Sequence, residues 1–117
     1  MKPDNILVKT TPSGPLVKIS DFGNSKEISP EGAGGEYFKE GVATFRTMPP
    51  EMIQGKKFGK WADTWALGIL LYMLCALKHP FGKARIDAKD ILVKDPDYTE
   101  ISEKYSEETV NMIKLLL

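Results

Sequence analysis

Three polar side chains near the N-terminus have the types and spacing to bind a metal ion and a phosphate. Asn5 precedes one short apolar stretch, Asp21 follows a second, and turn-forming residues separate the two stretches. A β-hairpin built from these stretches returns its two ends to one place, so that an amide oxygen and a carboxylate lie side by side. Such oxygens suit a hard divalent cation such as Mg²⁺, and the positive charge of Lys2 suits a phosphate.

The strands of this predicted hairpin are residues 6–8 and 16–19, which are apolar or β-branched and flank a turn rich in Pro and Gly at 11–15. Downstream, residues 24–42 contain four glycines and follow neither a strand nor a helix period. This composition predicts a long surface loop, and loops of such length are usually functional or disordered.

Two helices are expected directly after the loop. A short one begins at Pro50, since proline suits a first helical turn, and ends before Gly55. A longer one spans 61–77, and its twelve residues 66–77 are apolar on every face. Such a helix is stable in water only when other elements surround it, and we expect the remaining segments to cover it poorly.

Two further helices are expected toward the C-terminus. One spans 87–93, with Ile86, Ile91 and Leu92 facing inward. Ser106 is expected to cap the last helix, whose apolar stripe comprises Val110, Ile113, Leu116 and Leu117. One hairpin followed by several helices predicts an α+β, mainly helical fold.

Composition and charge exclude several classes of protein. The chain has 117 residues, 42% of them hydrophobic, and its 16 basic and 16 acidic residues balance. No net field therefore attracts nucleic acid or an anionic membrane. Cys75 is the single cysteine, and the longest apolar run has 12 residues, against roughly 17–25 for a membrane span. We expect a soluble, cytoplasmic protein with no nucleic-acid or membrane partner.

Five spaced motifs together resemble those of the eukaryotic protein kinases. The chain carries KPDN at 2–5, DFG at 21–23, PPE at 49–51, DTWALG at 63–68 and HPF at 79–81. The corresponding family motifs are HRDxKPxN, DFG, APE and DxWxxG. The ordered set is far more specific than any one motif. It implies a protein-kinase-like C-lobe, and the apolar helix and the C-terminal sequence are similar to those of the NIMA-related (NEK) kinases.

The resemblance implies a role for each matching residue. Lys2 corresponds to the lysine that contacts the γ-phosphate and marks Ser/Thr specificity, and Asn5 and Asp21 correspond to the metal ligands. Leu7 corresponds to the floor of the adenine pocket and Ser20 to its back. The other matches are Thr44, which orients the catalytic residues, and the structural motif residues Phe22, Gly23, Glu51, Asp63, Trp65 and Gly68. The implied cofactors are ATP and Mg²⁺, and the implied partner is a protein substrate with a Ser or Thr hydroxyl.

The stretch before the PPE motif departs from the family pattern. Ala43 replaces the usual glycine, Phe45-Arg46-Thr47 occupies the usual Pro-Tyr-Tyr stretch, and Pro49 replaces alanine. These changes affect the surface on which the family docks its peptide substrate, not the metal site. Glu40 stands where many kinases have an activating phosphoacceptor, so its carboxylate could mimic that phosphate. The alternative is an exposed loop residue.

The resemblance also implies that residues 1–117 form a partial kinase domain, from the end of the catalytic loop to a late C-lobe helix. The sequence contains neither a GxGxxG loop nor an HRD triplet, and phosphoryl transfer needs a phosphate-covering loop and a catalytic aspartate. We expect the N-lobe, the HRD and the final part of the C-lobe to lie outside this chain, and the isolated chain to be inactive. The alternative is a non-catalytic, pseudokinase-like binding module or remnant.

Simpler interpretations apply to single residues. Lys2 alone would be a solvated charge and Asn5 a backbone cap, and only their spacing to Asp21 favours a site. His79 is expected to be structural, and Cys75 to be core packing. A solvated face, with peptide docking as the alternative, is expected for the basic residues Lys56, Lys57 and Lys60. The substrate, the phosphosites and the oligomeric state are left open.

Overall fold

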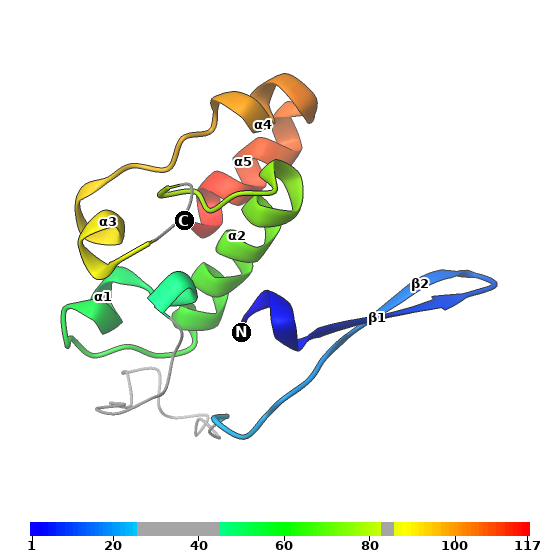
Figure 1. Ribbon diagram of the computed structural model, residues 1–117, viewed down its shortest axis with the longest axis horizontal. Coiled ribbons are helices and arrows are strands. Elements are labelled where there is room, and N and C mark those ends of the chain that lie inside the picture. Colours follow the sequence, from blue (N-terminus) through cyan, green and yellow to red (C-terminus); the bar gives the residue numbers. More distant parts are fainter. Residues whose placement is uncertain (26–44, 83–85) are drawn as a thin grey trace.

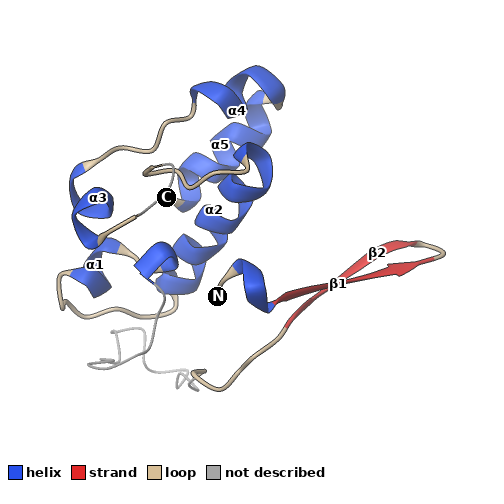
Figure 2. Cartoon of the chain, viewed as in Figure 1, coloured by secondary structure: helices blue, strands red, loops and turns tan. Residues whose placement is uncertain are grey.

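The computed structural model describes residues 1–25, 45–82 and 86–117. These residues form a β-hairpin near the N-terminus and a body of helices (Figure 1). The hairpin projects away from the body, and the long helix α2 runs through the body with the other helices around it (Figure 2). The predicted α+β, mainly helical architecture is confirmed.

The hairpin consists of β1 (Ile6–Thr11) and β2 (Gly14–Ile19), which pair antiparallel along their whole length. The ribbon is longer than the sequence predicts, because the turn is confined to the residues between these strands. Gly14 has φ +113°, a conformation that L side chains rarely adopt. Thr11 Oγ1 donates to the Gly14 carbonyl at 2.6 Å and closes the turn.

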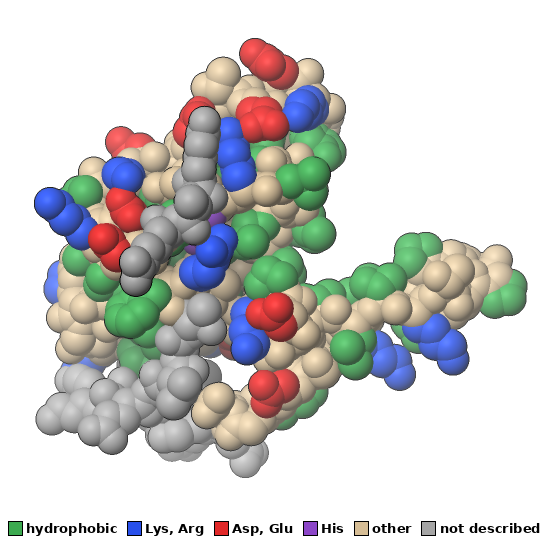
Figure 3. Space-filling view, in the orientation of Figure 1, with side chains coloured by type: hydrophobic (Ala, Val, Ile, Leu, Met, Phe, Trp, Pro, Cys, Tyr) green, Lys and Arg blue, Asp and Glu red, His purple; other side chains and the backbone are tan. Residues whose placement is uncertain are grey.

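Apolar side chains of the ribbon are exposed to solvent. Hydrophobic atoms line it in the space-filling view (Figure 3), and the exposed residues are Leu7, Val8, Leu16, Val17 and Ile19. A two-stranded hairpin that packs on nothing else is marginally stable in water. The antiparallel pairing of the two strands, rather than a buried core, therefore holds the ribbon together.

Helix α2 (Trp61–Ala76) is the centre of the helical body. The prediction that its apolar stretch would be poorly covered is wrong for most of the stretch, because short helices contact it on several sides. Within 66–77, Leu74 and Leu77 are the strongly exposed residues, at 63% and 90%. Within the ranges described above, no helix has the length and apolar character needed to cross a bilayer.

Two hydrophobic clusters cover α2. The first joins it to α4 (Thr99–Lys104) and α5 (Glu107–Leu116). Its buried residues are Tyr72, Ala76, Ile101, Val110 and Ile113. The second joins α2 to α1 (Pro50–Ile53) and α3 (Ala88–Val93). Its buried residues are Ile69, Phe81 and Ile91. Leu117 packs against both clusters, so that the two form one continuous core.

Helix α5 approaches α2 closely at Gly68. A Cβ added to Gly68 would stand 2.8 Å from Leu116 Cβ and 2.8 Å from Leu117 Cδ2, which is closer than such atoms can pack. The predicted apolar stripe of the last helix is confirmed, since Val110 and Ile113 are buried. Glycine at this position therefore allows Leu116 and Leu117 to pack directly against the backbone of α2.

The helix starts follow their sequence signals. Ser106 Oγ accepts a hydrogen bond from a first-turn backbone N–H of α5, as predicted. Asp87 and Asp90 form a reciprocal capping box at the start of α3. The prediction that Leu92 faces inward is wrong, because it is 40% exposed. This short helix has one buried position, Ile91, and the next residue lies about 100° around the helix.

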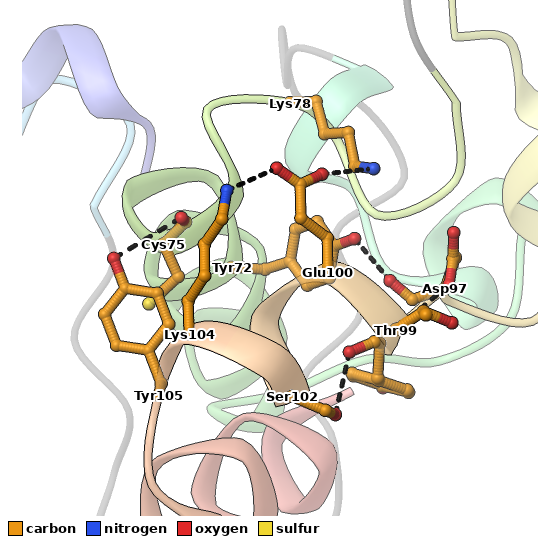
Figure 4. A network of polar contacts seen from close by, with 10 residues as sticks. Tyr72, Cys75, Lys78, Asp97, Thr99, Glu100, Ser102, Lys104 and Tyr105 are labelled. Carbon is orange, nitrogen blue, oxygen red and sulfur yellow. Dashed lines mark hydrogen bonds and ion pairs between the residues drawn. The ribbon is translucent and has the colours of Figure 1, made fainter.

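Helix α4 is not predicted by the sequence, since Ile101 is its one buried residue. Polar contacts hold it in place (Figure 4). The Glu100 carboxylate lies 2.7 Å from Lys78 Nζ, in the loop after α2, and 2.8 Å from Lys104 Nζ. Hydrogen bonds from Lys104 and Lys78 lower the pKa of Glu100 to about 2. A paired carboxylate thus links this helix to the end of α2.

Candidate active site

Asn5 and Asp21 lie side by side at the open end of the hairpin, as the sequence predicts. Asn5 ends a 3₁₀ turn, Pro3–Asn5, that leads directly into β1. Asp21 follows shortly after the end of β2. Asn5 Nδ2 donates to Asp21 Oδ2 at 3.2 Å, across 16 residues of sequence. The antiparallel pairing of the two strands is the reason for this contact.

The backbone at this end of the hairpin is fixed by Ser20. Its N–H and its Oγ both donate to the Asn5 carbonyl, at 2.8 and 3.1 Å. Asp21 then adopts φ +60°, a left-handed conformation that is uncommon outside glycine. Its Oδ1 accepts a hydrogen bond from the Gly23 N–H at 3.3 Å, as in an Asx turn. The carboxylate is therefore held from its own backbone as well as by Asn5.

The two side chains have the oxygen donors of a Mg²⁺ site. Asp21 is exposed and Asn5 is half-buried, so solvent reaches the pair. In the part of the chain that the structure describes, no group of three or more His, Cys, Asp or Glu could hold a metal. Mg²⁺ keeps several waters and is usually bound by one or two carboxylates together with substrate phosphates. A carboxylate with one amide oxygen fits that kind of site.

Three other predicted site residues lie close to the pair in sequence. The Lys2 carbonyl accepts from the Asn5 N–H at 3.1 Å, so the backbone of the lysine is tied to the pair. Leu7 lies on β1 opposite Lys18 and is 55% exposed, and Phe22 is 67% exposed. Two apolar side chains, one shortly after Asn5 and one directly after Asp21, are therefore exposed to solvent.

The downstream motif residues belong to the helical body. Glu51 lies in the first turn of α1 and is half-buried. Asp63, in the first turn of α2, is 3.6 Å from the amino group of Met1, so the segment before the oxygen pair lies against this helix. The Trp65 ring stacks on Phe81 with centroids 5.8 Å apart. The Trp65 Nε1 is buried, with no hydrogen-bond partner within the described residues.

Two predicted residues, Thr44 and Glu40, lie outside the described residues. The structure brings Asn5, Ser20 and Asp21 together by hydrogen bonds. It places Glu51 in α1, and Trp65 and Gly68 in α2, rather than at the pair itself.

His79 makes contacts that the sequence does not predict. It is 1% exposed, its Nε2 lies 2.6 Å from the Arg46 carbonyl oxygen, and its Nδ1 accepts from the Phe81 N–H at 3.3 Å. Burial lowers the pKa of the imidazole. Both partners are backbone groups, so no pattern of side chains reveals them, and the HPF motif is the one sequence signal for this position. The expected structural role is confirmed by these contacts.

Comparisons with known proteins give a consistent result. Residues 1–117 match the family described as Protein kinase domain. Serine/threonine-protein kinase ATG1a of Arabidopsis thaliana is 33% identical over 114 residues, which are 97% of this chain and 17% of the relative. Serine/threonine-protein kinase Nek8 of Danio rerio is 32% identical over 117 residues, 100% of this chain and 16% of the relative. Probable serine/threonine-protein kinase fhkC of Dictyostelium discoideum is 33% identical over 127 residues, which cover 98% of this chain and 20% of the relative.

The chain spans a fifth or less of the length of these relatives. The identity to Nek8, 32%, is no higher than the 33% identity to the other two proteins. The similarity to NIMA-related kinases noted in the sequence is therefore shared with other Ser/Thr kinases.

Proposed function

This chain belongs to the protein kinase domain family, and we propose that it forms the metal-binding and substrate-docking part of a Ser/Thr protein kinase. Members of the family transfer a phosphoryl group from ATP to a protein hydroxyl with the help of Mg²⁺. One observation carries the proposal. Asn5 Nδ2 lies 3.2 Å from Asp21 Oδ2 in a chain whose residues 1–117 match the family.

The residues at the open end of the hairpin have distinct proposed roles. Asn5 and Asp21 would hold Mg²⁺, which when bound neutralises phosphate charge. Lys2 would contact the γ-phosphate, and Leu7 and Ser20 would line the adenine side. The hydrogen bonds of Ser20 and Gly23 fix the two ligands before any nucleotide arrives. Fixed donors of this kind cost no reorganisation during the reaction.

Further parts of the machinery are proposed to come from sequence other than these 117 residues. The 117 residues contain neither a GxGxxG loop nor an HRD triplet. The family uses the loop to cover the phosphates and the aspartate of the triplet to accept the substrate proton. The isolated chain is therefore proposed to be a partial kinase domain with no activity of its own. Thr44 is proposed to orient Lys2, Glu40 to replace an activating phosphate, and the cytoplasm to be the site of action.

The test compares Asp21→Asn with Asp4→Asn in the full-length product of the gene. Both variants lose one negative charge, but Asp4 is an exposed residue of the 3₁₀ turn outside the Asn5–Asp21 contact. We expect Asp21→Asn to lower kcat/KM for peptide phosphorylation at least about a hundredfold, since a charge that acts on the transferring group is lost. Asp4→Asn should stay within about threefold of the unchanged protein. The measurement is incorporation of labelled phosphate from Mg²⁺–ATP.

Three outcomes would contradict the proposal or one of its parts. Equal activity of the Asp21→Asn variant and the unchanged protein would remove the pair from the chemistry. No activity from the full-length product, together with no Mg²⁺–ATP binding by calorimetry, would favour the non-catalytic binding module. Labelled phosphate transferred by the isolated 117-residue chain, above the level of its Asp21→Asn variant, would contradict the proposed dependence on further sequence.

A further inference from the structure

We propose that His79 is a positioning residue that holds the segment Phe45–Thr47 in place for a peptide substrate. This inference rests on the proposed function, because the resemblance assigns peptide docking to the stretch before the PPE motif. The observation is a hydrogen bond across 33 residues of sequence. The buried imidazole of His79, in the loop after α2, lies 2.6 Å from the carbonyl oxygen of Arg46.

The two partners determine which form of the imidazole is present. A carbonyl oxygen only accepts, so Nε2 must carry the proton that it donates to Arg46. The Phe81 N–H only donates, so Nδ1 must be unprotonated to accept it at 3.3 Å. Both bonds therefore exist together in the neutral Nε2–H tautomer and in no other form.

The contact links two segments of the helical body that are 33 residues apart in sequence. On one side, His79, Phe81 and Gly82 form a tight turn, in which the Gly82 N–H donates to the His79 carbonyl at 3.3 Å. On the other side, Phe45–Thr47 is a single 3₁₀ turn, closed by the Met48 N–H bound to the Phe45 carbonyl at 3.2 Å. One turn of 3₁₀ helix is weak by itself, so the bond from His79 supplies an anchor.

The Arg46 side chain is exposed, and His79 contacts the backbone carbonyl of this residue. The anchor therefore orders the backbone of the segment and leaves the guanidinium on the surface. That arrangement suits a docking surface, where the backbone conformation must be fixed before a peptide binds.

Burial of the imidazole favours its neutral form, and the charged groups around it act in both directions. Burial has the largest effect and lowers the pKa of His79, and the nearby Arg46 cation lowers it further. The hydrogen bond to the Arg46 carbonyl and the negative charge of Asp90 on α3 act in the opposite direction. A neighbouring cavity of about 370 Å³ is lined by His79 with the charged residues Lys78, Lys94, Asp95 and Asp97. Acidification would place a proton on Nδ1 opposite the Phe81 N–H and remove that hydrogen bond, whereas Nε2–H would keep its bond to the Arg46 carbonyl.

Three substitutions separate the two hydrogen bonds in the 117-residue chain. In place of His79, the two amides Gln and Asn both carry a donor and an acceptor, but the longer Gln reaches the position of Nε2 and can donate to Arg46, whereas the shorter Asn reaches the position of Nδ1 and can accept from Phe81. Ala keeps neither bond. The readout is amide hydrogen exchange at Met48, which reports on the 3₁₀ turn, compared with Val110, whose N–H is bound to the Ser106 carbonyl in α5. We expect Met48 exchange to rise about tenfold in His79→Asn and His79→Ala and to change little in His79→Gln.

The other outcomes of the exchange experiment overturn the proposal. A parallel rise at Met48 and Val110 in all three variants would show that His79 only stabilises the fold. No change at Met48 in His79→Asn would show that the bond to Arg46 does not order the segment. In the unchanged chain, ¹⁵N NMR should find the Nε2–H tautomer, and the Nδ1–H tautomer would contradict it.

A kinetic experiment connects this anchor to substrate docking. In the full-length gene product, His79→Asn should raise KM for a peptide about tenfold and leave KM for ATP unchanged, whereas His79→Gln should restore the peptide KM. Selective Met48 exchange together with an unchanged peptide KM would confirm the anchor and contradict its role in docking. An inactive full-length protein would contradict the proposed function, while the exchange result would still decide the anchor.

Discussion

The hairpin and the helical body are built on opposite principles. The hairpin carries the oxygen pair but exposes its apolar side chains, and hydrogen bonds hold it together. The helical body contains the buried core, with Tyr72, Ile101 and Ile113 fully buried, and carries no member of that pair. Burial of apolar area is the main stabilising contribution in proteins. The difference indicates that fold stability and the candidate chemistry can be changed separately.

The largest expected effect is on the helical body. Ile113→Ala removes a fully buried side chain from the cluster between α2, α4 and α5. We expect it to lower the free energy of unfolding by about 2–5 kcal/mol, from lost burial and a residual cavity. Urea denaturation followed by helical circular dichroism measures this loss.

The matched control for this substitution is Leu115→Ala. It lies on the same helix, is 87% exposed, and should change the free energy of unfolding by less than about 0.5 kcal/mol. Similar losses for both variants would mean that α5 does not pack with Ile113 inward.

An intermediate effect, dependent on pH, is expected at Glu100. Its pKa is about 2 in the folded protein, below the ordinary 4.5, because Lys104 and Lys78 donate to it. The stability from this carboxylate is fully present above pH 4.5 and is lost as the pH falls from 4.5 toward 2. Glu100→Gln should therefore be less stable than the unchanged chain at pH 6, and the two should converge near pH 2. Urea midpoints across this pH range test the prediction.

Glu103→Gln on the same helix is the control for Glu100→Gln. No ion pair among the described residues includes Glu103, so its urea midpoint should remain close to that of the unchanged chain throughout. A difference between Glu100→Gln and the unchanged chain that is independent of pH would show that charge pairing is not the cause.

The smallest expected effect is on the hairpin. Val17→Thr changes a residue that is 58% exposed and keeps a β-branched side chain in the strand. We expect a change in the free energy of unfolding below about 0.5 kcal/mol, and no change in Mg²⁺–ATP binding by the full-length protein. A loss above about 2 kcal/mol would mean that this side of the ribbon is buried in solution, and the contrast between the two regions would disappear.

Much of the fold could be predicted from the sequence because it follows local signals. The Pro and Gly residues between two β-branched stretches predict the hairpin, and Ser106 predicts the start of α5. The cover of α2 could not be predicted, because it comes from short helices that each contribute few apolar residues. Helix α4 contributes Ile101 alone, and its polar sequence has no helical period to detect.

The candidate site shows the same division. The contact between Asn5 and Asp21 could be predicted from the sequence, because a hairpin places its two ends side by side. The contact of His79 with Arg46 could not, since a backbone carbonyl is present at every residue and leaves no mark in the sequence. For the same reason, the hydrogen bond from Ser20 to the Asn5 carbonyl could not be predicted. Side-chain chemistry was therefore easier to predict than its backbone supports.

The antiparallel register of the hairpin also bears on the time scales of motion. All of its pairs are local in sequence, so closing the ribbon costs little loop entropy and takes about 1–10 μs. The core cluster, by contrast, must bring together Tyr72 and Ile113, which are far apart in the chain. The ribbon is therefore expected to open and close many times during the lifetime of the folded body. A ligand that binds Asn5 and Asp21 together would join the two ends of the ribbon, so its binding should slow the opening of the ribbon.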